Sequence, residues 1–189
     1  QGGVVALKGL GGFNLICNAE NEKAICRLRE IKKRYKKPFA VMFPDVPTLS
    51  HYLNILPLEK EIVSSWRRPI VLLEEKQKIG TGINDGYKTV GAMLPYLPVH
   101  YHLFASSELK ALVMTSGNRG DNPILTDNDA ALSDLLREVD LFVEHNRDIS
   151  NRVDDSIVQV VGEQPRIIRR SRGFTPEPLS LKFDTEGIL

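Results

Sequence analysis

The stretch "VVALKGLGGFNLICNA", residues 4–19, contains two apolar runs on either side of a glycine-rich segment. The apolar runs cover residues 4–7 and 13–17, and Gly9, Gly11 and Gly12 lie between them. Short apolar runs that flank glycines are typical of two strands joined by a turn. A strand pair is therefore expected here, and the fold class depends on the segments after residue 19.

A helix is expected after this pair, with Asn18 or Asn21 as its N-cap and its end at Pro38. The apolar residues at helical spacing are Ala24, Ile25, Leu28, Ile31 and Tyr35. Further helices are expected from about Leu58 and over residues 127–138, the latter capped by Asp127 or Asn128.

Short apolar runs elsewhere predict more strands. They lie in "FAVMF" (39–43), "SSWRRPIVLLEE" (64–75), "TVGAMLPY" (89–96), "ALVMTSGN" (111–118), "LFVEH" (141–145), "SIVQVV" (156–161) and "RIIRR" (166–170). Strands that alternate with helices and end in a strand-rich region predict an α/β domain around a mixed, twisted sheet. Residues 75–88 are expected to form a mobile surface loop.

Composition narrows the class of protein. The chain has 189 residues, enough for one domain with a substantial core, and 42% of them are apolar. Its 25 basic and 24 acidic side chains give a formal charge of +1, whereas general nucleic-acid or membrane-surface binders usually carry a larger basic excess. Cys17 and Cys26 have neither metal-site nor redox spacing, which favours a reducing cytoplasm. The glycine-rich start without Met predicts a piece of a longer protein.

A local basic cluster stands out against this neutral total. "KKRYKK", residues 32–37, holds five cations in six positions. On a helix, Lys32 and Lys36 share one face, and Lys33 and Lys37 share the next. Two interpretations remain open: a solvated basic face, or a site for an anion.

"TSGNRG", residues 115–120, comes directly after a predicted buried strand. In α/β sheets, ligands bind at the carboxyl ends of strands. The side chains of Thr115, Ser116 and Asn118, with the backbone N–H groups beside the glycines, suit a phosphate oxygen. The same residues also make a good turn, and they do not form a Walker P-loop.

Two further polar segments are ambiguous. In "EHNRDISNRVDDS", residues 144–156, His145, Arg147, Arg152, Asp154 and Asp155 can orient a small polar substrate, hold a divalent cation or neutralise one another. In "RIIRRSRG", residues 166–173, strand alternation places Arg166, Ile168 and Arg170 on one face and Ile167 and Arg169 on the other. Arg170 or Arg172 can reach a phosphate, but charges that protect an edge strand are an alternative explanation. His100 and His102 in "HYH" are expected on a helix, in surface and packing roles.

In their order, several segments resemble the YrdC-like domain of the hydrogenase-maturation carbamoyltransferase HypF. The resemblance runs from about Val4 to Leu179 and includes "KGLGGFNLICNA", "LREIKKRYKKPFAVM", "RRPIVLLE", "GAMLPYLPVHYHLF", "LVMTSGNRGDNPI", "LFVEHNRDISNRVDDSIV" and "RRSRGFTPEPL". The related threonylcarbamoyl-adenylate synthases carry a Lys-x-Arg and a Ser-x-Asn element. These elements fall on Lys32 with Arg34, and on Ser116 with Asn118.

The resemblance implies a fold and a reaction. The fold would be a YrdC-like twisted mixed sheet, flanked by helices and with a concave, positively charged cavity. Residues 1–180 would form a nucleotide-binding, adenylating domain, and residues 181–189 an extended tail. The reaction would join carbamate, made from carbamoyl phosphate, to ATP, giving carbamoyl adenylate and pyrophosphate, with Mg²⁺ on the phosphates. In the HypF family, acylphosphatase, zinc-finger and transfer domains complete carbamoyl transfer to the partner HypE for the cyanide ligands of NiFe hydrogenase.

The resemblance also implies residue roles. Lys32, Arg34 and Lys37 would hold the β- and γ-phosphates, while Ser116 and Asn118 would contact the triphosphate near its α-position, with Thr115 close by. Second-rank candidates for the same cavity are Lys8, Arg170 and Arg172. The candidates for carbamate are His145, Arg147 and Arg152, and Asp154 and Asp155 would orient those arginines or help the metal.

Other functions stay open from the sequence. A threonylcarbamoyl-adenylate synthase acting in tRNA modification would use the same fold and ATP site, with threonine and bicarbonate. A double-stranded RNA or tRNA binding module would use the positive cavity without nucleotide chemistry. A regulatory ATP sensor would keep the binding residues and lose turnover.

Overall fold

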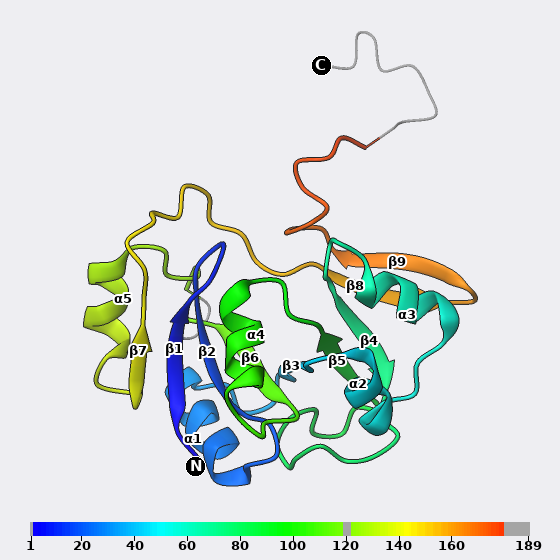
Figure 1. Cartoon of the computed structure of the whole chain (residues 1–189), viewed down its shortest axis with the longest axis horizontal. Coiled ribbons are helices and arrows are strands. Elements are labelled where there is room, and N and C mark those ends of the chain that lie inside the picture. The colour runs from blue at the N-terminus through cyan, green and yellow to red at the C-terminus, as the bar shows by residue number, and fades with distance from the viewer. Residues whose placement is uncertain (1, 119–121, 180–189) are drawn as a thin grey trace, which may run out of the picture.

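A computed structural model describes residues 2–118 and 122–179, and it shows a mixed α/β architecture (Figure 1). The strands in these ranges are β1 (Val4–Lys8), β2 (Phe13–Asn18), β3 (Ala40–Met42), β4 (Ile70–Glu74), β5 (Thr89–Met93), β6 (Leu112–Ser116), β7 (Leu141–Val143), β8 (Ile157–Val161) and β9 (Gln164–Arg169). The helices are α1 (Glu22–Lys32), α2 (Val46–Tyr52), α3 (Pro57–Ser64), α4 (Pro98–Ala105) and α5 (Asn128–Leu135). The tail expected over residues 181–189 lies outside the described residues.

The strands form one sheet in the order β7-β1-β2-β6-β3-β5-β4-β8-β9. Three neighbouring pairs are parallel, β1 with β7, β3 with β5 and β4 with β8, and the others are antiparallel. The predicted mixed sheet and α/β class are therefore confirmed. In the described part of the chain, no helix is long and apolar enough to cross a membrane.

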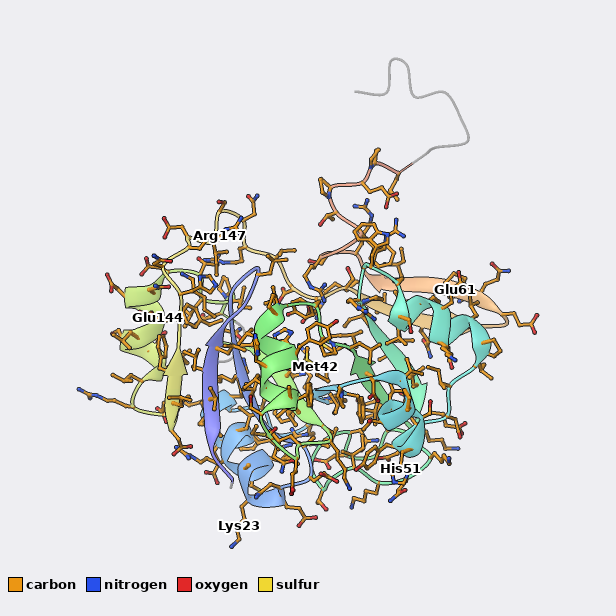
Figure 2. The ribbon with its side chains drawn as sticks, viewed as in Figure 1. Lys23, Met42, His51, Glu61, Glu144 and Arg147 are labelled. Atoms are coloured by element: carbon orange, nitrogen blue, oxygen red, sulfur yellow. The ribbon has the colours of Figure 1, made fainter. Side chains whose placement is uncertain are left out.

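The two faces of the sheet are covered unequally. The larger core joins one face to α1, α2, α3 and α5, through residues such as Leu28, Leu49, Val63 and Leu135. On the other face, Val99, Leu103 and Phe104 of α4 pack against a smaller cluster of sheet residues, one of which is Met42 (Figures 1 and 2). The smaller cluster also includes Ile70 and Met114, which line a cavity on this face.

The helix caps agree with the predicted chemistry. The side chain of Asn21 accepts a hydrogen bond from the Ala24 amide at 3.0 Å, and Asp127 accepts one from the Ala130 amide at 2.8 Å. Each satisfies an amide that has no partner within its helix. Asn21 and Asp127 are therefore the caps, rather than Asn18 and Asn128.

The end of α1 differs from the prediction. The helix ends at Lys32, and Lys33 adopts a left-handed conformation with φ 50°, where its amide bonds to the Arg29 and Glu30 carbonyls. The helix therefore stops before Pro38, Lys36 lies beyond it, and the shared faces expected for Lys32 with Lys36 and for Lys33 with Lys37 do not form. Tyr35, expected on the apolar face, is 70% exposed.

Two other segments also depart from the prediction. Residues 75–88 form no helix or strand of their own, yet Ile79 and Ile83 are buried in the larger core and the Ile83 carbonyl accepts from the Phe39 amide. The segment is thus anchored by its two isoleucines and is more than a surface loop. Helix α2 was not predicted. Its signal was Asp45, which caps the helix by accepting from the Thr48 amide, with a proline in the first turn.

Candidate functional site

A cavity of about 810 Å³ brings together segments that are far apart in the sequence. Its walls come from the glycine turn after β1, the loop after α1, the end of β6, and two short segments before β8 and after β9. The predicted site residues that line it are Lys32, Arg34, Lys37, Thr115, Ser116, Asn118, Asp154, Asp155 and Arg172. The Lys-x-Arg and Ser-x-Asn elements therefore meet in one place.

Lys32 joins these two elements directly. Its side chain is buried, and Nζ donates hydrogen bonds to the Ser116 carbonyl at 2.7 Å, the Asn118 carbonyl at 2.7 Å and Asn118 Oδ1 at 2.5 Å. Ser116 Oγ donates to the same Oδ1 at 2.6 Å. Lys32 thus fixes the turn at the end of β6 against the end of α1.

The electrostatics of Lys32 reflect this position. The pKa of Lys32 is lowered from 10.5 to about 8, first by burial and then by the positive charges of Arg34 and Lys37, while the charge of Asp154 acts in the opposite direction. Burial disfavours the charged form, and nearby cations do the same. An anion bound in the cavity would act in the opposite direction and stabilise the protonated amine.

Arg34 is held in the loop after α1 by its own neighbourhood. Its Nε donates to the Lys37 carbonyl at 3.2 Å, Nη1 donates to Thr115 Oγ1 at 3.2 Å, and Nη2 donates to the Pro38 carbonyl. Burial, with the charges of Arg29 and Arg169, lowers the pKa of Arg34 to about 10. The guanidinium therefore connects the loop to Thr115 at the end of β6.

Arg29 is a residue whose role the sequence did not reveal. Its buried side chain crosses from α1 to the loop, where Nη1 donates to the Arg34 carbonyl at 2.6 Å, and Nε donates to the Gly82 carbonyl at 2.8 Å. Arg29 and Arg34 both lie over the ring of Phe39, at 4.7 Å and 5.1 Å from its centroid. The available signal was a position on α1 one turn before the basic cluster, which helical spacing makes close in space.

The glycine turn allows a close approach at the opposite wall. A Cβ on Gly11 would lie 2.2 Å from the Val153 carbonyl oxygen, and one on Gly12 would lie 2.4 Å from Cγ1 of Ile124. Both glycines and both contacted residues line the cavity. The glycines of the turn are therefore required for this wall to close against residues 122–124 and 153–155.

Arg172 lines the cavity but is committed to structure. Its Nε donates to Asp155 Oδ1 at 2.9 Å, and Nη1 and Nη2 donate to the carbonyls of Arg67 and Arg68 at 3.1 and 2.8 Å. Its guanidinium also lies 3.6 Å from the centroid of the Tyr96 ring. Burial and the charge of Asp155 raise the pKa of Tyr96. Arg172 and Asp155 thus form a buried ion pair that shapes the wall.

The remaining candidates lie elsewhere. Lys8 donates to the His145 carbonyl at 3.0 Å, and Arg170 donates to the Glu177 carbonyl. Neither residue is among the described residues that line the cavity, and the same holds for His145, Arg147 and Arg152. Figure 2 shows Arg147 on the loop between β7 and β8, beyond the ends of the strands. His100 is buried in α4, with its ring edge-on to Tyr96 at 4.6 Å, and His102 lies on the same helix.

Strand β9 departs from the predicted alternation. It is an edge strand, as one interpretation of its charges required, but its pairing with β8 contains a bulge. Ile157 pairs with Arg169 while Val158 pairs with Ile167, so Ile168 is the extra residue. Ile167 and Arg169 were expected to share a face. Because each pairs with a different one of two adjacent β8 residues, they lie on opposite faces.

Protein ligands for a metal are sparse. The described residues contain no group of three or more His, Cys, Asp or Glu side chains that could hold a metal ion. Asp154 and Asp155 both line the cavity, but Asp155 is already paired with Arg172 at 2.8 Å. Asp154 is therefore the carboxylate that faces the cavity without that pairing, which fits a cation held mainly by a ligand's own oxygens.

The chain is similar in sequence to known proteins over nearly its whole length. The chain is 42% identical over its whole length to the carbamoyltransferase HypF of Rhizobium leguminosarum bv. viciae, and 40% identical over 98% of its length to that of Synechocystis sp.. It spans about a quarter of each of these relatives, 26% and 24%.

Solved structures show the same fold. A full-length HypF in a phosphate- and nucleotide-bound form is 48% identical, with a TM-score of 0.92 over 96% of this chain and 29% of the HypF chain. T. kodakarensis HypF is 41% identical, with a TM-score of 0.93 over 97% of this chain and 24% of that one. P. abyssi Sua5 in complex with L-threonine shares the fold at 20% identity, with a TM-score of 0.79 over 90% of this chain and 51% of Sua5.

The family profile named for Sua5, YciO and YrdC and described as "Telomere recombination" matches residues 1–171. This match covers the whole cavity except Arg172, including the end of α1, the end of β6 and the bulged β9. On this match the chain belongs to the Sua5/YciO/YrdC family.

Proposed function

We propose that this domain joins carbamate to ATP, giving carbamoyl adenylate and pyrophosphate, as one step in the work of a longer carbamoyltransferase. The observation that carries the proposal is the convergence of Lys32 and Arg34 with Thr115, Ser116 and Asn118 at one cavity. The similarity to HypF proteins supports it, because one of them was solved with nucleotide bound.

The proposed chemistry needs no nucleophilic side chain. A carbamate oxygen attacks the α-phosphorus of ATP, the bond from that phosphorus to the bridging oxygen of the β-phosphate breaks, and pyrophosphate leaves with the electron pair. Negative charge grows on the leaving group, so cations positioned in advance are the main source of rate enhancement. Lys32, Arg34 and Lys37 would supply this charge, and Ser116 and Asn118 would contact the triphosphate near its α-position.

The residues present fit a magnesium ion that is bound chiefly by the nucleotide. Mg²⁺ in nucleotide sites usually takes one or two carboxylates and several phosphate oxygens. Asp154 would be its contact with the protein, because Asp155 is held by Arg172. Bound there, the ion would supply positive charge to the phosphates as pyrophosphate departs.

The wider role is part of the same proposal. Acylphosphatase, zinc-finger and transfer domains of the longer protein would deliver carbamate and pass the carbamoyl group to HypE in the cytoplasm, for the cyanide ligands of NiFe hydrogenase. The identity of 38–42% to curated HypF proteins, against 20% to Sua5, favours carbamate over threonylcarbamate as the group that is adenylated.

ATP–pyrophosphate exchange tests this function. We expect exchange by the 189-residue chain to depend on carbamoyl phosphate or freshly made carbamate, and not on threonine with bicarbonate. The Lys32→Ala/Arg34→Ala variant should lose at least about 100-fold of the rate, since charge-assisted contacts contribute about 1.5–3 kcal/mol each.

A matched control is available on the same helix. Lys23 is exposed and projects away from the body of the molecule (Figure 2), Arg27 is partly exposed, and neither is among the described residues that line the cavity. The Lys23→Ala/Arg27→Ala variant removes the same two charges and should keep the wild-type exchange rate. Exchange that depends on threonine with bicarbonate would show that threonylcarbamate, and not carbamate, is the group that is adenylated. ATP binding without any exchange would indicate a nucleotide sensor.

A further inference from the structure

A second cavity, of about 490 Å³, lies beside the one that holds Lys32 and Arg34. Its walls come from the turn between α3 and β4, the segment between β5 and α4, and α4 itself. The lining includes aromatic rings, prolines and an arginine: Trp66, Tyr96, Tyr101, Pro95, Pro98 and Arg68. We call this cavity the Trp66 groove, and the proposed adenylation makes no use of it.

Two aromatic rings of the Trp66 groove are exposed. Trp66 is 77% exposed and Tyr101 is 51% exposed, although large aromatic rings usually contribute their area to a core or an interface. The Tyr101 hydroxyl donates to the Pro95 carbonyl at 3.1 Å, which fixes this ring against the segment before α4. Grooves lined by aromatic rings are where proline-rich segments dock, because a polyproline helix is extended before it binds and loses little entropy.

Arg68 gives the groove a positive charge, and no Asp or Glu is among the described residues that line it. The Arg68 side chain makes no hydrogen bond or ion pair with residues 2–118 or 122–179. Its backbone is left-handed, with φ 45°, and its carbonyl accepts from Arg172 Nη2 at 2.8 Å. Residues other than glycine cost energy in this conformation and cluster at binding sites. The groove is therefore complementary to a negatively charged ligand.

The neighbouring arginine shows which kind of segment this surface can hold. Arg67 Nη2 donates to Glu177 Oε2 at 2.6 Å, and its guanidinium lies 4.8 Å from the centroid of the Trp66 ring. Glu177 belongs to "TPEPL", residues 175–179, where a proline stands on each side of the glutamate. An acidic, proline-flanked segment of the chain itself thus binds next to Trp66, and Arg68 offers a second cation of the same kind in the groove.

We propose that the Trp66 groove is a docking site for an extended, acidic, proline-containing segment of a partner protein. The prolines would pack on the rings of Trp66 and Tyr101, and a carboxylate would pair with Arg68, whose planar donors can match both of its oxygens. Tyr96 lines both cavities and carries the Arg172 guanidinium 3.6 Å from its ring centroid. A docked segment would therefore contact the wall that the two cavities share.

Trp66 is the single tryptophan of the chain, so intrinsic fluorescence reports directly on the groove. The probe is a synthetic peptide that repeats Pro-Pro-Glu, titrated into the 189-residue chain. We expect a saturable shift of the emission to shorter wavelength as the ring is covered. The same peptide with Gln in place of Glu should bind about fivefold more weakly, the loss of one exposed ion pair, and a peptide that repeats Pro-Pro-Lys should not bind.

Two variants separate the rings from the charge. Tyr101→Ala should weaken both the Glu and the Gln peptide at least about fivefold, since an aromatic wall is lost. Arg68→Gln should weaken only the Glu peptide and bring it to the affinity of the Gln peptide, a pattern that general loss of structure would not produce. Tyr87→Ala and Arg166→Gln are the matched controls, because both residues are exposed and neither is among the described residues that line the groove. Both should bind as the wild type does.

Several results would overturn the inference. They are an emission that no peptide changes, equal affinity for the Glu, Gln and Lys peptides, and equal losses in Tyr101→Ala and Tyr87→Ala. An emission shift that grows with protein concentration alone would also overturn it, because a second copy of the chain would then occupy the groove. None of these readouts involves ATP, so their failure leaves the adenylation proposal intact, and a chain without pyrophosphate exchange would leave the groove as a docking site.

Discussion

Two segments of this chain were expected to bind anionic substrates, residues 32–37 the triphosphate and residues 145–152 carbamate, and they behave differently in the fold. In residues 32–37, Lys32 and Arg34 donate six hydrogen bonds to protein groups and face the cavity. In residues 145–152, the side chains of His145, Arg147 and Arg152 are exposed and are not among the described residues lining the cavity. The comparison teaches that density of charge in a sequence does not by itself locate a site. The distinguishing feature is the set of acceptors that fix each cation.

The largest effect is expected at the residue that holds the first segment in place. Arg29→Lys keeps the charge but cannot donate to both the Gly82 and Arg34 carbonyls in the fork geometry of a guanidinium. The loop after α1 would lose its fixed position, and with it the placement of Arg34. We expect KM for ATP in the exchange assay to rise about tenfold with a smaller change in kcat, since small misplacements of binding groups are costly.

Arg27→Lys is the matched control for this substitution. Arg27 lies on the same helix and pairs with Asp140 at 2.5 Å, with both side chains substantially exposed. Exposed ion pairs contribute little, so wild-type kinetics are expected. An Arg29→Lys protein that unfolds at a lower temperature but keeps the wild-type KM would show that Arg29 supports the fold without positioning the cations.

A smaller effect is expected from pH. The pKa of Lys32 is about 8 in the folded protein, below its ordinary 10.5. Between these values the unfolded chain holds the proton more tightly, so this residue makes the free energy of unfolding rise with pH. Bound phosphates favour the charged amine, so ATP binding should take up a proton above about pH 8. We expect ATP affinity to fall about fivefold to tenfold from pH 7 to pH 9, the loss of protonated amine at a pKa near 8.

Calorimetry in buffers of different ionisation heat measures this proton uptake directly. Lys32→Met removes the titrating group and should show weak binding with a flat profile over the same range. A wild-type affinity that is constant from pH 7 to pH 9, with no proton uptake, would mean that Lys32 stays protonated throughout and that its burial is offset by its three acceptors.

Local sequence patterns were sufficient for the mixed α/β class and for narrowing each of two helix caps to two residues, whereas the convergence of "KKRYKK" with "TSGN" was expected from the resemblance. Apolar periodicity and capping residues act over a few positions, and the resemblance supplied the pairing of segments that lie far apart in the sequence. The left-handed Lys33, the anchoring of Ile79 and Ile83, the role of Arg29 and the bulge in β9 could not be predicted in this way. Each depends on contacts made only after folding, such as the Gly82 carbonyl for Arg29 and the pairing with β8 for the bulge.

The smallest effect is expected in residues 145–152, where the assignment of carbamate to His145, Arg147 and Arg152 stays a prediction. Replacing all three with alanine tests it. Because these side chains are exposed and lie apart from the described cavity lining, we expect the triple variant to keep its ATP affinity and to change the KM for carbamate less than about twofold, as surface substitutions away from a site usually do. A tenfold rise in that KM at unchanged ATP affinity would establish the three residues as carbamate contacts. The loop between β7 and β8 would then have to move toward the cavity when carbamate binds. Both segments would in that case belong to the site, and they would differ only in that residues 145–152 reach it after the ligand has bound.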